Sequence, residues 1–129
     1  DMIVNENGKA IRYGDLAQYI LDKRIPLEIC LSSNLHTGAI DKIENHPFGT
    51  LYKEKFRVTI NTDDRLMSDT TLTKEFLIAV EHFNLTFEDI EKITINSMKS
   101  SFIHYDERLR YIYDVIKPGF KDVKSKLEE

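Results

Sequence analysis

The 129-residue sequence contains one cysteine, Cys30, which excludes an internal disulfide and a cysteine-based metal cluster. A lone cysteine fits a reducing compartment, so we expect a cytoplasmic protein. The sequence also lacks any apolar run near the ~20 residues that a membrane-spanning helix needs, so no membrane association is expected. No signal peptide is visible, but the opening Asp1-Met2-Ile3-Val4 reads like the interior of a longer chain and says little about targeting.

Clusters of basic residues are missing as well. Four lysines lie between residues 117 and 126, but Asp122 and the final Glu128-Glu129 offset them, and the formal net charge is −4. We interpret residues 121–129 as a solvated polar tail. Binding of nucleic acid through its phosphates is therefore not expected. The remaining composition, 41% hydrophobic and 31% charged, is typical of one globular domain.

The most informative segment is residues 57–64, which reads Arg-Val-Thr-Ile-Asn-Thr-Asp-Asp. A β-branched run ends there in two adjacent carboxylates, Asp63 and Asp64. Side chains alternate along a strand, but the chain turns at a strand's end, where both carboxylates can address one site. Barrels and open parallel sheets gather their chemistry at the C-terminal ends of strands. One aspartate could bind a metal and the other a substrate, although a purely structural pair or a helix cap is also compatible with this pattern.

The rest of the sequence predicts alternating helices and strands. A turn is expected at residues 5–8, and two short apolar strands at residues 27–31 and 56–60. A long polar loop follows at residues 61–69. One helix is predicted to begin at Asp15 as its N-cap, and a second to run from Pro47 to about residue 55. Three more are predicted in the second half of the sequence: residues 73–83, the capping box at 86–89 to about residue 98, and residues 106–116. Pro118-Gly119 is expected to end the last of them.

Two strands joined by a helical crossover indicate one parallel pair. Such a pair is not a domain, because parallel strands need further neighbours and cover on both faces. The fold class is therefore α/β and incomplete. Either upstream residues of the same chain or a complementing fragment would complete the sheet. Glu28 lies in the otherwise apolar first strand and is predicted to be a buried, paired carboxylate of a barrel. Ser33 follows that strand and either faces the site or closes the turn.

Four segments, in order and at plausible spacing, resemble the C-terminal portion of the adenosine deaminase family. They are residues 27–34 (LEICLSSN), 46–48 (HPF), 58–64 (VTINTDD) and 68–76 (SDTTLTKEF). The resemblance extends from about residue 14 to 120. It implies a zinc-dependent (β/α)8 barrel, the TIM-barrel architecture, in which residues 27–31 form strand seven and residues 56–60 form strand eight. The whole chain, 1–129, would then be the C-terminal part of one barrel domain.

The resemblance also implies a role for each aspartate. The first aspartate of the family's pair ligates zinc, and Asp63 takes that position. The second hydrogen-bonds to N7 of the purine, and Asp64 matches it. The family's other ligands, its proton shuttle and its water-orienting histidine lie upstream, so no catalytic residue is expected in this chain. Arg65 stands where many members have proline, and the four histidines do not fall on the ligand motifs (His36, His46, His82 and His104).

The implied activity belongs to purine metabolism: hydrolytic deamination of adenosine and deoxyadenosine to inosine and ammonia, with one Zn²⁺ per complete site. Adenine deaminase and AMP deaminase of the same family are alternatives, and a non-catalytic truncated fragment is the alternative from another class. We expect the chain by itself to be inactive and not to retain zinc, because one carboxylate cannot hold the ion tightly. Purine N7 and an ionised carboxylate both only accept hydrogen bonds, so a direct contact requires a proton on Asp64.

Overall fold

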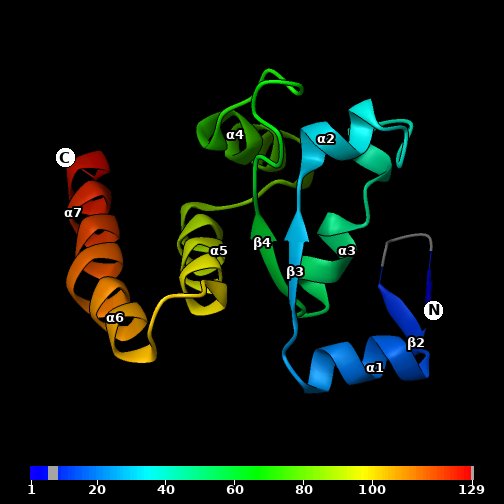
Figure 1. Ribbon diagram of the computed structural model, residues 1–129, viewed down its shortest axis with the longest axis horizontal. Helices are drawn as coiled ribbons and strands as arrows, with labels where there is room; N and C mark the ends of the chain where they lie inside the picture. Colours follow the sequence, from blue (N-terminus) through cyan, green and yellow to red (C-terminus); the bar gives the residue numbers. More distant parts are fainter. Residues whose placement is uncertain (6–8, 129) are drawn as a thin grey trace. The chain divides into compact units, whose positions relative to one another are not determined.

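The computed structural model describes residues 1–5 and 9–128, and the chain divides into two compact units, Asp1–Leu85 and Thr86–Glu129. The elements of the first unit are β1 (Met2–Val4), β2 (Ala10–Tyr13), α1 (Asp15–Asp22), β3 (Pro26–Ile29), α2 (Leu31–His36), the 3₁₀ turn η1 (Ile43–Asn45), α3 (Phe48–Lys53), β4 (Arg57–Ile60) and α4 (Leu72–Phe83) (Figure 1). Those of the second are α5 (Phe87–Ser100), α6 (Tyr105–Arg110), the π-helical segment η2 (Tyr111–Ile116) and α7 (Lys117–Leu127).

The predicted parallel pair is confirmed, since β3 and β4 run side by side with Leu27 opposite Val58 and Ile29 opposite Ile60. The N–H of Asn61 donates to the carbonyl of Ile29 at 2.8 Å, so the pairing continues past the end of β4. Both arrows point the same way in Figure 1, and α2 and the loop of residues 61–71 lie beyond their tips. The expected loop after the second strand is therefore present, and it lies where parallel folds place their sites.

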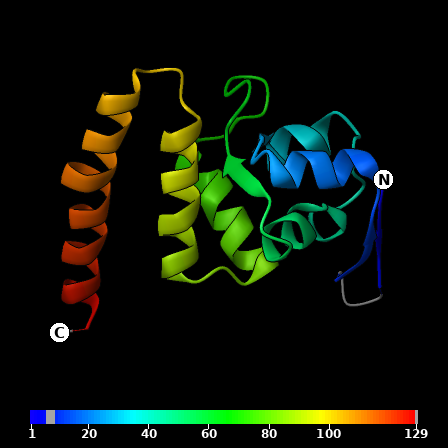
Figure 2. The ribbon, with the colours of Figure 1, turned by 90° about the horizontal axis from the view of Figure 1, so that it is seen from below.

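Apolar side chains of the strands and of the following helices form the core of the first unit. Val58 and Ile60 of β4 are buried, and α4 packs alongside β4 (Figure 2). Phe48 of α3 is completely buried and lies against Phe83 of α4, with 5.0 Å between the ring centroids. A Cβ on Gly49 would approach the Phe83 ring to 3.0 Å, so glycine permits this close packing. The core therefore fixes α4, and with it the far end of the 61–71 loop.

The sheet remains open. Among the described residues, β3 pairs with β4 and with no further strand, so no barrel closes and the predicted incomplete α/β architecture is confirmed. Glu28 is exposed in this open sheet, and its burial and pairing in a closed barrel stay a prediction. It projects from the strand opposite to its neighbours Leu27 and Ile29, and the described part of the chain places no element over it that would bury it.

The N-terminal residues differ from the prediction. β1 and β2 form an antiparallel hairpin that the sequence did not predict, and residues 6–8 of the expected turn lie outside the described residues. The N-cap of α1 is Gly14 rather than Asp15, and the carboxylate of Asp1 accepts the N–H groups of Leu16 and Ala17, each at 3.0 Å. The carboxylate of Asp1, which precedes β1 and lies far from α1 in the sequence, caps the helix in place of the local one, and a short sequence window cannot reveal this.

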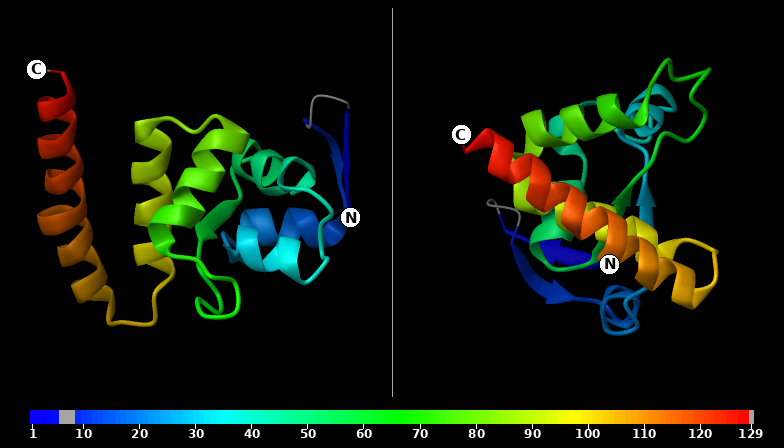
Figure 3. Two further views of the ribbon diagram at one scale, coloured as in Figure 1. Left: turned by 90° about the horizontal axis from the view of Figure 1, so that it is seen from above. Right: turned by 90° about the vertical axis from the view of Figure 1, so that its left-hand side faces the viewer.

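Helices make up the second unit. The predicted capping box is confirmed: the Thr86 hydroxyl accepts from the Asp89 N–H, and the Asp89 carboxylate accepts from the Thr86 N–H at 3.0 Å. Figure 3 shows α5 beside the helix that α6, η2 and α7 form together. In the described residues, no helix is both long and apolar enough to cross a membrane.

The prediction that Pro118-Gly119 ends a helix is wrong, because the chain stays helical to Leu127. Pro118 lies in the first turn of α7, where a missing N–H is tolerated, and it follows directly on the wider π-helical turns of η2. The residues interpreted as a polar tail form, up to Leu127, the exposed end of α7, and Lys124 there pairs with Glu88 of α5 at 2.5 Å.

Candidate functional site

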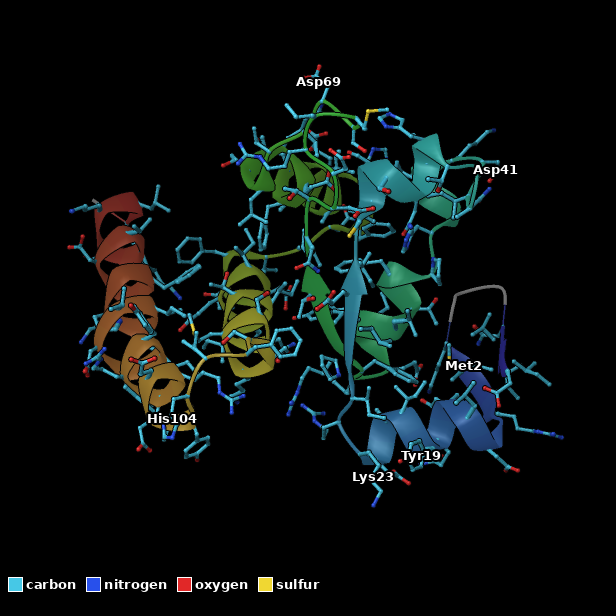
Figure 4. The ribbon with its side chains drawn as sticks, viewed as in Figure 1. Met2, Tyr19, Lys23, Asp41, Asp69 and His104 are labelled. Carbon is cyan, nitrogen blue, oxygen red and sulfur yellow. The ribbon has the colours of Figure 1, made fainter. Side chains whose placement is uncertain are left out.

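Asp63 lies three residues beyond β4, in the loop that Asp69 marks in Figure 4. Its backbone is in the left-handed region (φ 52°), which aspartate and asparagine tolerate better than other side chains. Its Oδ2 accepts a hydrogen bond of 2.8 Å from the hydroxyl of Ser33 in α2. The structure thus brings together Ser33, which follows β3, and Asp63, which follows β4, and the Ser33 hydroxyl faces the site.

Asp64 turns back into its own loop. Its Oδ1 accepts the N–H groups of Leu66 at 3.1 Å and Met67 at 3.3 Å, and its carbonyl accepts the N–H of Ser68 at 3.0 Å. This side-chain-to-backbone turn leaves Leu66 and Met67 exposed, 92% and 81% respectively. The structure therefore orders both carboxylates at the same edge of the sheet, Asp63 through Ser33 and Asp64 through its own loop.

Cys30 adds a neutral group beside the carboxylates. Burial raises the pKa of the Cys30 thiol, and the negative charges of Asp63, Glu75 and Glu28 raise it further, whereas a backbone N–H of Asp63 opposes them. The thiol therefore stays protonated at neutral pH. The structure places Cys30 as the N-cap residue of α2, half-buried between the strand and the site.

One residue that sequence reasoning missed, Glu75, holds this region together. Glu75 of α4 is completely buried, and its carboxylate accepts hydrogen bonds from the N–H of Ser32 and the hydroxyl of Thr70. A signal was available in the sequence, because the apolar residues Ala79 and Phe83 follow Glu75 at the helical spacing that places all three on one face. An acidic residue on the apolar face of an amphipathic helix indicates a buried, hydrogen-bonded carboxylate.

The histidines serve other contacts. His46 is buried; its Nδ1 accepts from the N–H of Phe48 at 2.9 Å, so its Nε2 carries the hydrogen and donates to Asn34 Oδ1, also at 2.9 Å. Burial lowers the pKa of His46, which keeps the ring neutral. His82 lies 3.0 Å from the Glu44 carboxylate. Neither imidazole is directed at Asp63.

This chain supplies one side chain that is suited to bind a metal ion, the carboxylate of Asp63. Asp63 Oδ1 accepts no hydrogen bond from any described residue, while Ser33 holds Oδ2. An oriented carboxylate with a free oxygen is a suitable zinc ligand. Within the part of the chain that the structure describes, no group of three histidine, cysteine, aspartate or glutamate side chains is arranged to hold a metal ion. The remaining ligands of such a site would come from residues outside this chain.

The chain is similar to known proteins in both sequence and fold. The family model described as adenosine deaminase matches residues 7–118. Adenosine deaminase 1 of Streptomyces coelicolor is 52% identical over 125 residues, which are 97% of this chain and 31% of that protein. Among solved structures, adenine deaminase from Arthrobacter aurescens superimposes with a TM-score of 0.78 at 23% identity, over 84% of this chain and 33% of that one. An amidohydrolase from Burkholderia ambifaria, solved with bound Zn, gives 0.77 at 15% identity, over 88% and 32%.

The fold and the comparisons show that this α/β chain corresponds to the C-terminal part of a TIM-barrel enzyme. The chain belongs to the adenosine deaminase family. It spans about a third of the length of the curated relatives and solved structures that it matches.

Proposed function

We propose that this chain is the C-terminal third of an adenosine deaminase and supplies two groups of its active site, a zinc ligand (Asp63) and a purine contact (Asp64). The observation that carries the proposal is the Asp63 carboxylate, which follows β4: Ser33 fixes one oxygen, and the other accepts no hydrogen bond from the residues that the structure describes. In the complete barrel, meaning a protein in which the upstream strands precede these residues, the reaction would convert adenosine or deoxyadenosine to inosine and ammonia. A cytoplasmic location stays a prediction.

A zinc ion held by Asp63 and the upstream ligands would lower the pKa of a coordinated water towards ~7 and so supply a nucleophile at neutral pH. The chain's own contribution is to orient the ligand. The Ser33 hydroxyl restrains the Asp63 carboxylate, and such restraint of a metal ligand commonly changes metal affinity or activity by roughly 10–100-fold.

Asp64 would hold the purine through its second carboxylate oxygen. Because Oδ1 already accepts the N–H groups of Leu66 and Met67, Oδ2 is the oxygen that would carry the proton and donate it to purine N7. The exposed side chains of Leu66 and Met67 lie in the same loop, where they would cover the base once the remaining strands are in place.

The test of this function is the conversion of adenosine to inosine by the complete barrel with added zinc, with adenine and AMP as competing substrates. We expect adenosine to give the highest kcat/KM, in agreement with the named function of the curated relatives. The matched control is the 129-residue chain alone, which should give no turnover. Faster deamination of adenine or AMP would overturn the substrate assignment, and turnover by the chain alone would contradict the division of the site between two parts of the barrel.

Asparagine at position 64 should preserve substrate binding, whereas alanine should not. In Asp64→Asn, the amide oxygen can accept the Leu66 and Met67 N–H groups while the amide nitrogen donates to N7. Asp64→Ala removes both interactions, and we expect its KM for adenosine to rise by roughly 10–100-fold, the effect of losing one or two hydrogen bonds. Steady-state kinetics of both variants in the complete barrel provide the comparison. Equal loss of affinity in both variants would exclude a protonated Asp64 as the donor.

A further inference from the structure

Glu75 is a carboxylate without contact to solvent, with 0% of its surface exposed. A buried carboxylate is costly unless hydrogen bonds replace its water. Both of its oxygens have such partners: Oε2 accepts the N–H of Ser32 at 3.1 Å, and Oε1 accepts the hydroxyl of Thr70 at 2.6 Å. The side chain is therefore held at both oxygens, and its position is closely defined.

The two partners come from the segments that follow the two parallel strands. Ser32 lies in the first turn of α2, directly after β3, and Thr70 ends the loop that follows β4. Both residues are buried. Glu75 thus ties the start of α2 to the far end of the loop that carries Asp63 and Asp64.

A second hydrogen bond, in the candidate site, joins the same two segments. Ser33, the neighbour of Ser32, donates its hydroxyl to Asp63 at 2.8 Å. The loop is consequently held at Asp63 by Ser33 and at Thr70 by Glu75. Between these points, the Thr70 N–H donates to the Arg65 carbonyl at 3.2 Å, so a movement of Thr70 would be transmitted into the loop.

We propose that Glu75 is a positioning residue for the zinc ligand: through Ser32 and Thr70 it fixes the distance between Ser33 and Asp63. The proposal rests on the function proposed above, because it assigns a purpose to the placement of Asp63. Glu75 does not touch the metal or the substrate. Its loss would let α2 and the loop move apart and would leave the Asp63 carboxylate less well oriented.

Three variants of the complete barrel separate positioning from simple support of the core. Glu75→Gln can keep both contacts, because its amide oxygen can accept from Ser32 and its amide nitrogen can donate to Thr70. Glu75→Ala loses both contacts. Thr70→Val loses one contact and keeps nearly the same side-chain shape. Glu81→Ala is the matched control, since Glu81 is an exposed glutamate on the same helix.

The decisive readout is the zinc dissociation constant, measured by competition with a chromophoric chelator, together with kcat and KM for adenosine. We expect roughly 10–100-fold weaker zinc binding in Glu75→Ala, about 10-fold in Thr70→Val, and wild-type values within about 3-fold in Glu75→Gln and Glu81→Ala. The loss of activity should appear in kcat more than in KM, because Asp64 and not Asp63 contacts the purine.

Wild-type zinc affinity in a folded Glu75→Ala protein would overturn the proposal, because the residue would then only support the core. If Glu75→Ala does not fold, Thr70→Val decides, and unchanged zinc affinity in that variant overturns the proposal equally. Failure of the proposed function looks different: the wild-type barrel itself would bind no zinc or would not deaminate adenosine, and the proposal for Glu75 would fall with it.

Discussion

Asp63→Asn in the complete barrel is expected to weaken zinc binding and to lower kcat/KM for adenosine by roughly 100-fold or more, since removal of a ligand should cost at least as much as removal of a group that only orients one. Asparagine is the sharper substitution here, because it tolerates the left-handed backbone at position 63 and its amide oxygen can still accept from Ser33. The variant therefore removes the charge and the carboxylate that we propose as the metal ligand, while the loop keeps its conformation.

Asp69→Asn is the matched control for this experiment. Asp69 is an exposed aspartate in the same loop and also has a left-handed backbone (φ 44°), so the same chemical change is made in a similar conformation. Zinc content, zinc affinity and turnover of this control should equal those of the wild type. Retention of wild-type zinc affinity by Asp63→Asn would exclude Asp63 as a ligand.

Phe48→Ala should lower the free energy of unfolding of the complete barrel by about 3–5 kcal/mol, the usual cost of removing a fully buried phenylalanine. Phe48 is 0% exposed, and its ring centroid is 6.2 Å from that of Tyr52 and 5.0 Å from that of Phe83. Gly49 brings the helix so close to Phe83 that the vacated space cannot collapse without shifting α3 or α4.

Urea unfolding followed by circular dichroism measures this loss. Phe102→Ala serves as the control, since the Phe102 side chain is fully exposed and its removal should change stability by less than about 0.5 kcal/mol. A loss below about 1 kcal/mol for Phe48→Ala would show that the packing of α3 against α4 contributes little to this part of the barrel.

The sequence predicted the elements whose cause is local. The parallel pair follows from the two apolar strands and the crossover between them, and the capping box of α5 follows from Thr86 and Asp89 three residues apart. The loop after β4 and its aspartates were also expected. A few neighbouring residues determine each strand, the capping box and the loop, whereas the pairing of the strands was inferred from the crossover between them. The resemblance to the family added the place of these elements in a barrel.

The features that were missed depend on residues far apart in the chain. Helix α2 begins at Leu31, where a strand was predicted to end, and the N–H of Ser32 in its first turn is satisfied by Glu75, which lies 43 residues away. The Ser33–Asp63 hydrogen bond spans 30 residues. The burial of Glu28 was predicted for a complete barrel, and the described residues do not include the strands that would bury it.

A crystal structure of the complete barrel, grown with zinc and a non-hydrolysable purine nucleoside, tests the central claim most directly. We expect anomalous density for zinc with a carboxylate oxygen of Asp63 at about 2.0–2.2 Å, and Asp64 Oδ2 within about 3.2 Å of purine N7. Zinc bound entirely by other residues, with Asp63 still engaged only with Ser33, would contradict the account.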